Sequence, residues 1–243
     1  MTGPTRRART RRDAGGDVTV PVDWPTDEAA AVAEQLRLRP RVSTAGPAPA
    51  AGSLVAGVDV AYDDERDVVA AAAVLLDCAT LDVVHEATAV SPVAFPYLPG
   101  LLAFRELPAV LAALDALPVA PGLVVCDGYG VAHPRGLGLA SHLGVRTGLR
   151  TLGVAKTAFT FDHEPPAAER GAYSPLLDGD GAEVGRAVRT RQGVKPVFVS
   201  VGHRIGLDEA VETVLALTPS YRLPETTRRA DSLCRRALAR AVA

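Results

Sequence analysis

The chain has 243 residues, of which 48% are hydrophobic and 22% are charged, and its formal net charge is −2. These proportions favour one globular α/β domain that can bury a core, and they exclude a chain that is disordered throughout. The longest apolar run, Val68–Leu76, is too short to cross a bilayer, so no membrane partner is expected. The three cysteines form neither a zinc pattern nor a disulfide framework, which favours a cytoplasmic location.

The first residues are rich in arginine. Five arginines against one aspartate give residues 1–16 a charge of +4, against −6 for the rest of the chain. We predict a disordered tail over residues 1–20 and one folded domain over residues 21–243. The tail is either a solvated arm, which is the favoured alternative, or a source of sequence-independent phosphate contacts.

Hydrophobic periodicity and Gly/Pro punctuation predict the elements that follow. In chain order they are a helix over Asp27–Leu38, a connector over Pro40–Gly52, strands over Leu54–Tyr62, Val68–Leu76 and Leu81–Val90, a helix over Leu101–Leu117 that Pro108 kinks or restarts, and a strand over Val124–Cys126. A helix that begins at Pro134, strands over Thr151–Ala155 and Val197–Val201, and helices over Leu207–Leu217 and Glu225–Ala241 complete the order.

Three consecutive strands, followed by alternating helices and strands, predict a mixed β-sheet with helices on its faces. We therefore expect an α/β fold with a ribonuclease-H-like core in a single domain.

Three carboxylates fall where this fold would bring them together. Asp59 lies inside a strand otherwise free of charge, Asp127 ends the fourth strand, and Glu106 lies on the helix after PYLPG. An aspartate inside a strand is unfavourable unless a cation pairs with it. The alternative for each acid alone is a position that faces water. The first and fourth strands are predicted neighbours, so we expect the three side chains to converge.

A cluster of carboxylates without cysteine or histidine ligands selects a hard cation, Mg²⁺, for which Mn²⁺ can substitute. Metal-assisted hydrolysis of a phosphodiester bond is the reaction that such a site suits best. Lys156 ends the next strand at the same sheet edge and is predicted to assist, the alternative being a solvated lysine.

The fourth strand is followed by a glycine-rich stretch, DGYGVAHPRGLGLASHLGV. A backbone without Cβ atoms lets a flat ligand approach closely. Gly128 and Gly130, beside the acid, are therefore predicted to line a ligand pocket. Gly136, Gly138 and Gly144 are predicted to permit close helix packing instead.

Together these motifs resemble those of the endonuclease V family of deoxyinosine-directed repair nucleases. The similar segments run colinearly over residues 54–231 and leave the N-terminal tail outside. They are VAGVDVAY (55–62), FPYLPGLLAFRE (95–106), VCDGYGVAHPRGLGLASHLGV (125–145), GVAKTAF (153–159), VRTRQGVKPVFVSVGH (188–203) and RLPETTRRAD (222–231).

The resemblance implies a set of catalytic residues. Asp59, Glu106 and Asp127 correspond to the family's metal-binding acids, and Lys156 corresponds to its active-site lysine. Asp231 falls where the family has a further catalytic residue, which is aspartate in some members and histidine in others. The residues alone would place Asp231 on an exposed helix face.

The resemblance also implies the substrate contacts. The segment PYLP matches the family's strand-separating wedge, formed here by Pro96, Tyr97, Leu98 and Pro99. The prolines stiffen the loop, while the ring and the apolar tip can fill the gap left by an unstacked base. The alternative is a turn that buries Tyr97 in the core. The flipped hypoxanthine would be bound in a pocket lined by Gly100, Leu102, Gly128 and Leu139.

Three further residues match family segments with less defined roles. His133 occupies a position close to the family's metals, or it is a hydrogen-bonded structural histidine. Tyr129 stands where many relatives have glutamine, and it would stack on a nucleotide or change the range of lesions. His203 is interpreted as structural.

The implied activity is Mg²⁺-dependent cleavage of the second phosphodiester bond 3′ to deoxyinosine in DNA, which leaves 3′-hydroxyl and 5′-phosphate ends. The enzyme would be monomeric. The motifs leave open an endoribonuclease that cuts at inosine in RNA. A non-catalytic nucleic-acid-binding module is disfavoured by the complete set of acids, and a hydrolase of small phosphate esters is disfavoured by the wedge.

Overall fold

An eight-stranded mixed sheet runs through residues 24–243, the part of the chain that the computed structural model describes. The predicted tail, residues 1–20, lies outside the described residues. The strand order is β3-β2-β1-β4-β5-β8-β7-β6. The strands are β1 (Leu54–Asp63), β2 (Val68–Asp77), β3 (Val83–Pro92), β4 (Leu123–Asp127), β5 (Thr151–Ala155), β6 (Tyr173–Leu177), β7 (Glu183–Val188) and β8 (Val197–His203). The helices are α1 (Glu28–Leu38), a 3₁₀ turn (Arg39–Arg41), α2 (Leu102–Asp115), α3 (Leu139–Thr147), α4 (Leu207–Ala216) and α5 (Glu225–Ala241).

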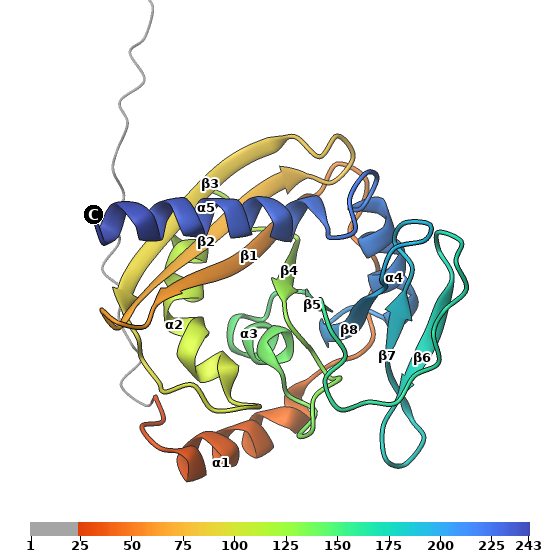
Figure 1. Ribbon diagram of the computed structural model, residues 1–243, viewed down its shortest axis with the longest axis horizontal. Coiled ribbons are helices and arrows are strands. Elements are labelled where there is room, and N and C mark those ends of the chain that lie inside the picture. The colour runs from red at the N-terminus through yellow and green to blue at the C-terminus, as the bar shows by residue number, and fades with distance from the viewer. Residues whose placement is uncertain (1–23) are drawn as a thin grey trace, which may run out of the picture.

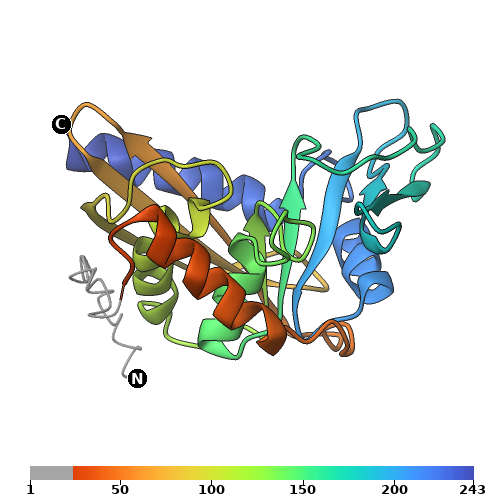
Figure 2. The same ribbon diagram turned by 90° about the horizontal axis from the view of Figure 1, so that it is seen from below.

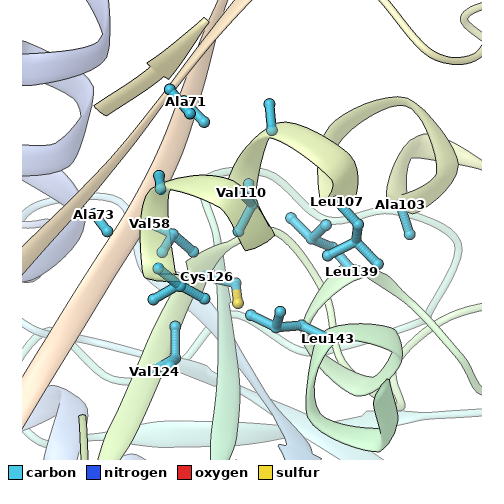
Figure 3. Packing of buried hydrophobic residues seen from close by; sticks show 14 of the residues in the cluster. Val58, Ala71, Ala73, Ala103, Leu107, Val110, Val124, Cys126, Leu139 and Leu143 are labelled. Carbon is cyan, nitrogen blue, oxygen red and sulfur yellow. The ribbon is translucent and has the colours of Figure 1, made fainter. Parts of the chain in front are cut away.

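Helices cover both faces of the sheet, and α5 lies across β1 and β2 (Figure 1). On the other face, β1, β2 and β4 pack against α2 and α3, where Val58, Leu107 and Leu143 belong to one buried cluster (Figure 3). The second view shows α1 beside α3, with which it packs (Figure 2). The predicted α/β class with a mixed sheet between helices is confirmed. None of the helices within residues 24–243 combines the length and the hydropathy that a membrane span requires.

Pro108 does not restart its helix as the sequence had allowed, because α2 runs without interruption from Leu102 to Asp115. A proline inside a helix leaves the carbonyl four residues earlier without its N–H partner. Here that carbonyl belongs to Phe104, and it accepts a hydrogen bond of 2.9 Å from the indole Nε1 of Trp24. A side chain from the start of the described chain thus replaces the missing backbone donor.

One further prediction differs from the structure, and one hairpin was missed. The helix predicted to begin at Pro134 begins at Leu139, because Gly136 has a left-handed φ of 65° that no right-handed helix accommodates. The hairpin of β6 and β7 was not predicted. Its outer strand has only five residues and contains Pro175, which is tolerated because β6 lies at the edge of the sheet.

Candidate active site

The two aspartates predicted to share a site lie side by side on neighbouring parallel strands. β1 pairs in parallel with β4, with Val58 opposite Cys126, so the predicted contact between the first and fourth strands is confirmed. Asp59 and Asp127 are the next residues along the two strands. Since successive side chains alternate between faces, both leave the same face of the sheet, the one that α5 covers.

A lysine and a third aspartate lie close to this pair. Lys156, directly after β5, forms an ion pair with Asp127. Asp231 lies on α5, where Arg235 binds it at 2.9 Å. The negative charge of Asp231 contributes to raising the pKa of Asp59, so the helix brings this carboxylate near the sheet residues. Asp231 is half-buried rather than fully exposed.

Glu106 approaches from α2, on the opposite face of the sheet, and only 7% of it is exposed. Its Oε1 accepts a hydrogen bond of 3.0 Å from the hydroxyl of Tyr62. Burial raises the pKa of Glu106 to about 8, and the charges of Asp59 and Asp127 contribute in the same direction. Burial and the charge of Asp127 likewise raise the pKa of Asp59, to about 7. The carboxylates therefore lie near enough to repel one another.

The donor set suits a hard divalent cation. With the side chains in their present conformations, residues 24–243 contain no group of three or more His, Cys, Asp or Glu residues that could hold a metal ion. The acids nevertheless supply oxygen ligands in a site with an excess of negative charge, which is the chemistry that Mg²⁺ selects. In this part of the chain only one oxygen of each carboxylate has a partner: Val60 N on Asp59, Tyr62 on Glu106, Lys156 on Asp127 and Arg235 on Asp231.

The crowding of the acids predicts a pH-dependent effect on stability. Because the pKa of Asp59 is about 7 in the fold and 3.8 ordinarily, its contribution to stability is lost as pH rises from about 4 through about 7. In EDTA, Asp59→Asn is therefore expected to raise the melting temperature at pH 8.5 by at least about 3 °C and to change it little at pH 4.5. Differential scanning fluorimetry at both pH values measures this difference.

The exposed Asp82 supplies the control for that measurement, since Asp82→Asn should leave the melting temperature unchanged at both pH values. A melting temperature of Asp59→Asn that rises equally at both pH values would contradict the electrostatic account.

A cavity of about 150 Å³ opens beside the acids. A cavity of about this volume can take up a flat aromatic group. Its lining includes all four residues predicted for the base pocket, Gly100, Leu102, Gly128 and Leu139, and three of the four predicted wedge residues, Tyr97, Leu98 and Pro99. Gly128 follows Asp127 directly, so consecutive residues connect the cavity to the acid cluster. The lining residues that the sequence analysis missed are Gln35, Ala103, Gly138 and Phe159.

One wall of the cavity is fixed by hydrogen bonds to the carbonyl oxygen of Gly100. The amide of Gln35 donates to it at 2.9 Å, and the guanidinium of Arg135 at 2.8 Å. His133 completes the set through Nε2 at 2.9 Å, while its Nδ1 accepts from the Arg135 backbone N–H. Burial and the charge of Arg135 lower the pKa of His133 to about 4, so the ring is neutral. These contacts favour the hydrogen-bonded structural interpretation of His133.

Aromatic rings form the outer part of the cavity. Tyr97 is 67% exposed, which excludes the alternative that the PYLP turn buries it in the core. The hydroxyl of Tyr129 donates a hydrogen bond to the carbonyl of Thr157. The ring of Tyr129 lies 6.0 Å from the ring of Phe159. Phe159 is itself 43% exposed, and its ring also lies 6.3 Å from the imidazole of His133.

The glycines that follow β4 do not all have the predicted roles in the cavity lining or in packing. Gly130 does not line the cavity; a Cβ there would lie 1.9 Å from the carbonyl oxygen of Val201 in β8. Its role is close packing between chain segments. Gly144 packs as predicted, because a Cβ would lie 2.3 Å from that of His203. His203 in turn accepts the Ser43 backbone N–H at Nδ1, which agrees with its structural interpretation.

Comparison with known proteins identifies the family. The sequence profile of the family described as Endonuclease V matches residues 34–232. The chain belongs to the endonuclease V family. Endonuclease V of Streptomyces avermitilis is 68% identical over 228 residues, which cover 93% of this chain and 99% of the relative. As an endonuclease V family member the chain is an endonuclease, a hydrolase of phosphodiester bonds.

Solved structures of the family share the fold. The crystal structure of Streptomyces avermitilis endonuclease V superposes with a TM-score of 0.90 at 69% identity, covering 93% of this chain and 99% of that one. Ciona intestinalis endonuclease V, solved in complex with a 24mer DNA containing an inosine followed by a ribo-adenosine, has a TM-score of 0.77 at 26% identity. It covers 88% of this chain and 98% of its own.

Proposed function

We propose that this endonuclease V family member is a Mg²⁺-dependent DNA repair enzyme that binds deoxyinosine and cleaves the second phosphodiester bond 3′ to it, leaving 3′-hydroxyl and 5′-phosphate ends. The observation that carries the proposal is the junction of a cavity that can take up a flat base with a cluster of carboxylates. Gly128 lines the cavity, and its neighbour Asp127 belongs to the cluster. A base in the cavity would therefore keep its own strand beside the acids.

The DNA complex of the Ciona intestinalis relative supports the substrate class, because that DNA contains an inosine. Since the same DNA carries a ribo-adenosine after the inosine, RNA is the second candidate substrate.

Asp59, Glu106 and Asp127 would hold the cation, each through an oxygen that has no partner among the described residues. A bound divalent cation supplies charge neutralisation and a water of lowered pKa. Burial alone would lower the pKa of Lys156, but the hydrogen bond and charge of Asp127 outweigh it and raise the pKa. Lys156 thus stays protonated at neutral pH and stabilises negative charge near Asp127, rather than acting as a base.

The cavity would select the base by shape and by fixed polar groups. Leu102 and Leu139 provide apolar walls, while Gly128 has a φ of 148°, a conformation that side-chain-bearing residues rarely adopt. A flat ring can lie against this backbone. The hydrogen-bonded Gly100 holds its part of the lining in place, so its backbone is a fixed part of the surface that a base would meet.

A cleavage assay on matched oligonucleotides tests the proposal. Purified protein with Mg²⁺ is given a duplex with one deoxyinosine, its undamaged twin, and an RNA strand with one inosine. We expect one cut, at the second bond 3′ to the deoxyinosine, with an end that a polymerase extends, and no cut in EDTA. Equal cleavage of the undamaged twin would overturn the proposal, and faster cleavage of the RNA would establish the second candidate.

Tyr97→Ala is expected to reduce the preference for inosine-containing over undamaged DNA by about 5–150-fold. Stacking of one base on an aromatic ring contributes about 1–3 kcal/mol, and the exposed Tyr97 is the ring placed to replace a flipped base. The ratio of cleavage rates on the two duplexes measures the change. Tyr173→Ala, at another exposed tyrosine, should leave this ratio unaltered. An unaltered ratio for Tyr97→Ala would refute the wedge.

A further inference from the structure

Arg105, the neighbour of Glu106 on α2, makes three contacts with two other segments of the chain. Its Nη1 donates to the carbonyl oxygen of Phe95 at 3.2 Å, directly before the PYLP turn. Its Nη2 donates to Asp64 at 2.6 Å, in the turn after β1. Its guanidinium carbon lies 4.6 Å from the centroid of the Tyr62 ring. One side chain therefore joins the start of the wedge turn to the end of β1.

Tyr62 links this arrangement to the acid cluster. Its hydroxyl donates to Glu106 Oε1 at 3.0 Å, while the guanidinium of Arg105 covers its ring. The ring also packs against the buried cluster between the sheet and α2. Glu106 thus has one oxygen held by a side chain that is itself held in place, and its second oxygen has no partner among residues 24–243.

Stability alone gives little reason for these contacts. Arg105 is only 8% exposed, whereas the side chain of its ion-pair partner Asp64 is 81% exposed. An ion pair with so exposed a partner contributes little free energy, and apolar side chains commonly replace buried charges without loss of stability. Arg105 differs from an ordinary buried residue in which groups it contacts, rather than in how much these contacts stabilise the fold.

We propose that Tyr62 and Arg105 are positioning residues of the endonuclease. Tyr62 fixes the carboxylate of Glu106 for the cation, and Arg105 ties this ligand to the start of the wedge turn. The cation ligand and the wedge then keep a constant separation. The inference rests on the proposed function, because it assumes that Glu106 is a cation ligand and PYLP a wedge. Residues that hydrogen-bond to a metal-binding carboxylate orient it, and their loss typically weakens metal binding by about 10–100-fold.

The test is Mn²⁺ affinity, measured by electron paramagnetic resonance of the free ion. Tyr62→Phe removes only the hydroxyl, and we expect it to weaken Mn²⁺ binding by about 10–100-fold without lowering the melting temperature by more than about 3 °C. The matched control is Tyr173→Phe, because Tyr173 also lies under a guanidinium, that of Arg186 at 4.4 Å, but far along the sheet on β6. This control should bind Mn²⁺ like the wild type.

A second variant examines the link to the wedge. Arg105→Lys keeps the charge but cannot make all three contacts, so the preference for inosine-containing over undamaged DNA should fall by about tenfold. Unchanged Mn²⁺ affinity in Tyr62→Phe, or unchanged preference in Arg105→Lys, would overturn the positioning inference while the wild type still binds Mn²⁺ and cuts at inosine. A wild type that binds no Mn²⁺ would instead overturn the proposed function itself.

Discussion

Asp127→Asn is expected to lower the rate of cleavage at deoxyinosine by at least about 1,000-fold. Asp127 lies beside Asp59 on the neighbouring strand and forms an ion pair with Lys156, so it is the carboxylate that joins the acid cluster to the cavity at Gly128. A cation at such a site stabilises the transition state by several kcal/mol, and each 1.4 kcal/mol corresponds to a factor of ten in rate. Single-turnover cleavage of an inosine-containing duplex measures the loss.

Two controls accompany this variant. Asp77→Asn, at the end of β2, should keep wild-type activity, because the side-chain oxygen of Asp77 only accepts backbone N–H groups, which an amide oxygen also does. Binding of the inosine duplex should remain in Asp127→Asn, since the cavity lining is unchanged. Wild-type turnover in Asp127→Asn with Mg²⁺ would exclude Asp127 as a cation ligand.

Gly57→Ala is expected to lower the melting temperature by about 5–10 °C and the activity of the folded enzyme by at least tenfold. A Cβ on Gly57 would lie 2.2 Å from the carbonyl carbon of Thr226 and 2.3 Å from its oxygen, in the first turn of α5. Helix backbone cannot rotate away as a side chain can, so α5 must move. Overpacking costs about 1–3 kcal/mol, and each kcal/mol corresponds to about 2–4 °C in a chain of this size.

The loss of activity would follow from Asp231, which the same helix carries to the acid cluster. Activity is therefore compared at a temperature where both proteins are folded, as judged by circular dichroism. Gly179→Ala is the matched control, because a Cβ there meets no atom within 4 Å. Full activity in a destabilised Gly57→Ala enzyme would show that catalysis does not depend on the position of α5.

The strand pattern alone predicted that two of the carboxylates would lie on neighbouring strands. Asp59 and Asp127 were identified because a charge is unexpected in an apolar strand, and the parallel pairing of β1 with β4 brings them together. Gly128 was assigned correctly to the cavity lining, whereas Gly130 was not, since the packing of Gly130 depends on Val201 of a distant strand.

The sequence pattern could not predict contacts between side chains that are distant in sequence. Pro108 predicts an interruption of its helix from local rules, and only the indole of Trp24 shows how α2 continues through it. Helical spacing puts Gln35 on the same face of its predicted helix as Ala31 and Leu38, so its burial could have been predicted. Its partner could not, because the carbonyl of Gly100 is 65 positions away. The same holds for Tyr62, whose hydroxyl reaches Glu106 only through the packing of α2 on the sheet.

Anomalous diffraction from crystals soaked in Mn²⁺ tests the central claim most directly. The claim is that side chains from two strands and one helix share a divalent cation beside a cavity for a single base. It predicts an anomalous peak within direct coordination distance of carboxylate oxygens of Asp59, Glu106 and Asp127. A fully occupied Mn²⁺ peak elsewhere, with no density among these three side chains at saturating concentration, would contradict it.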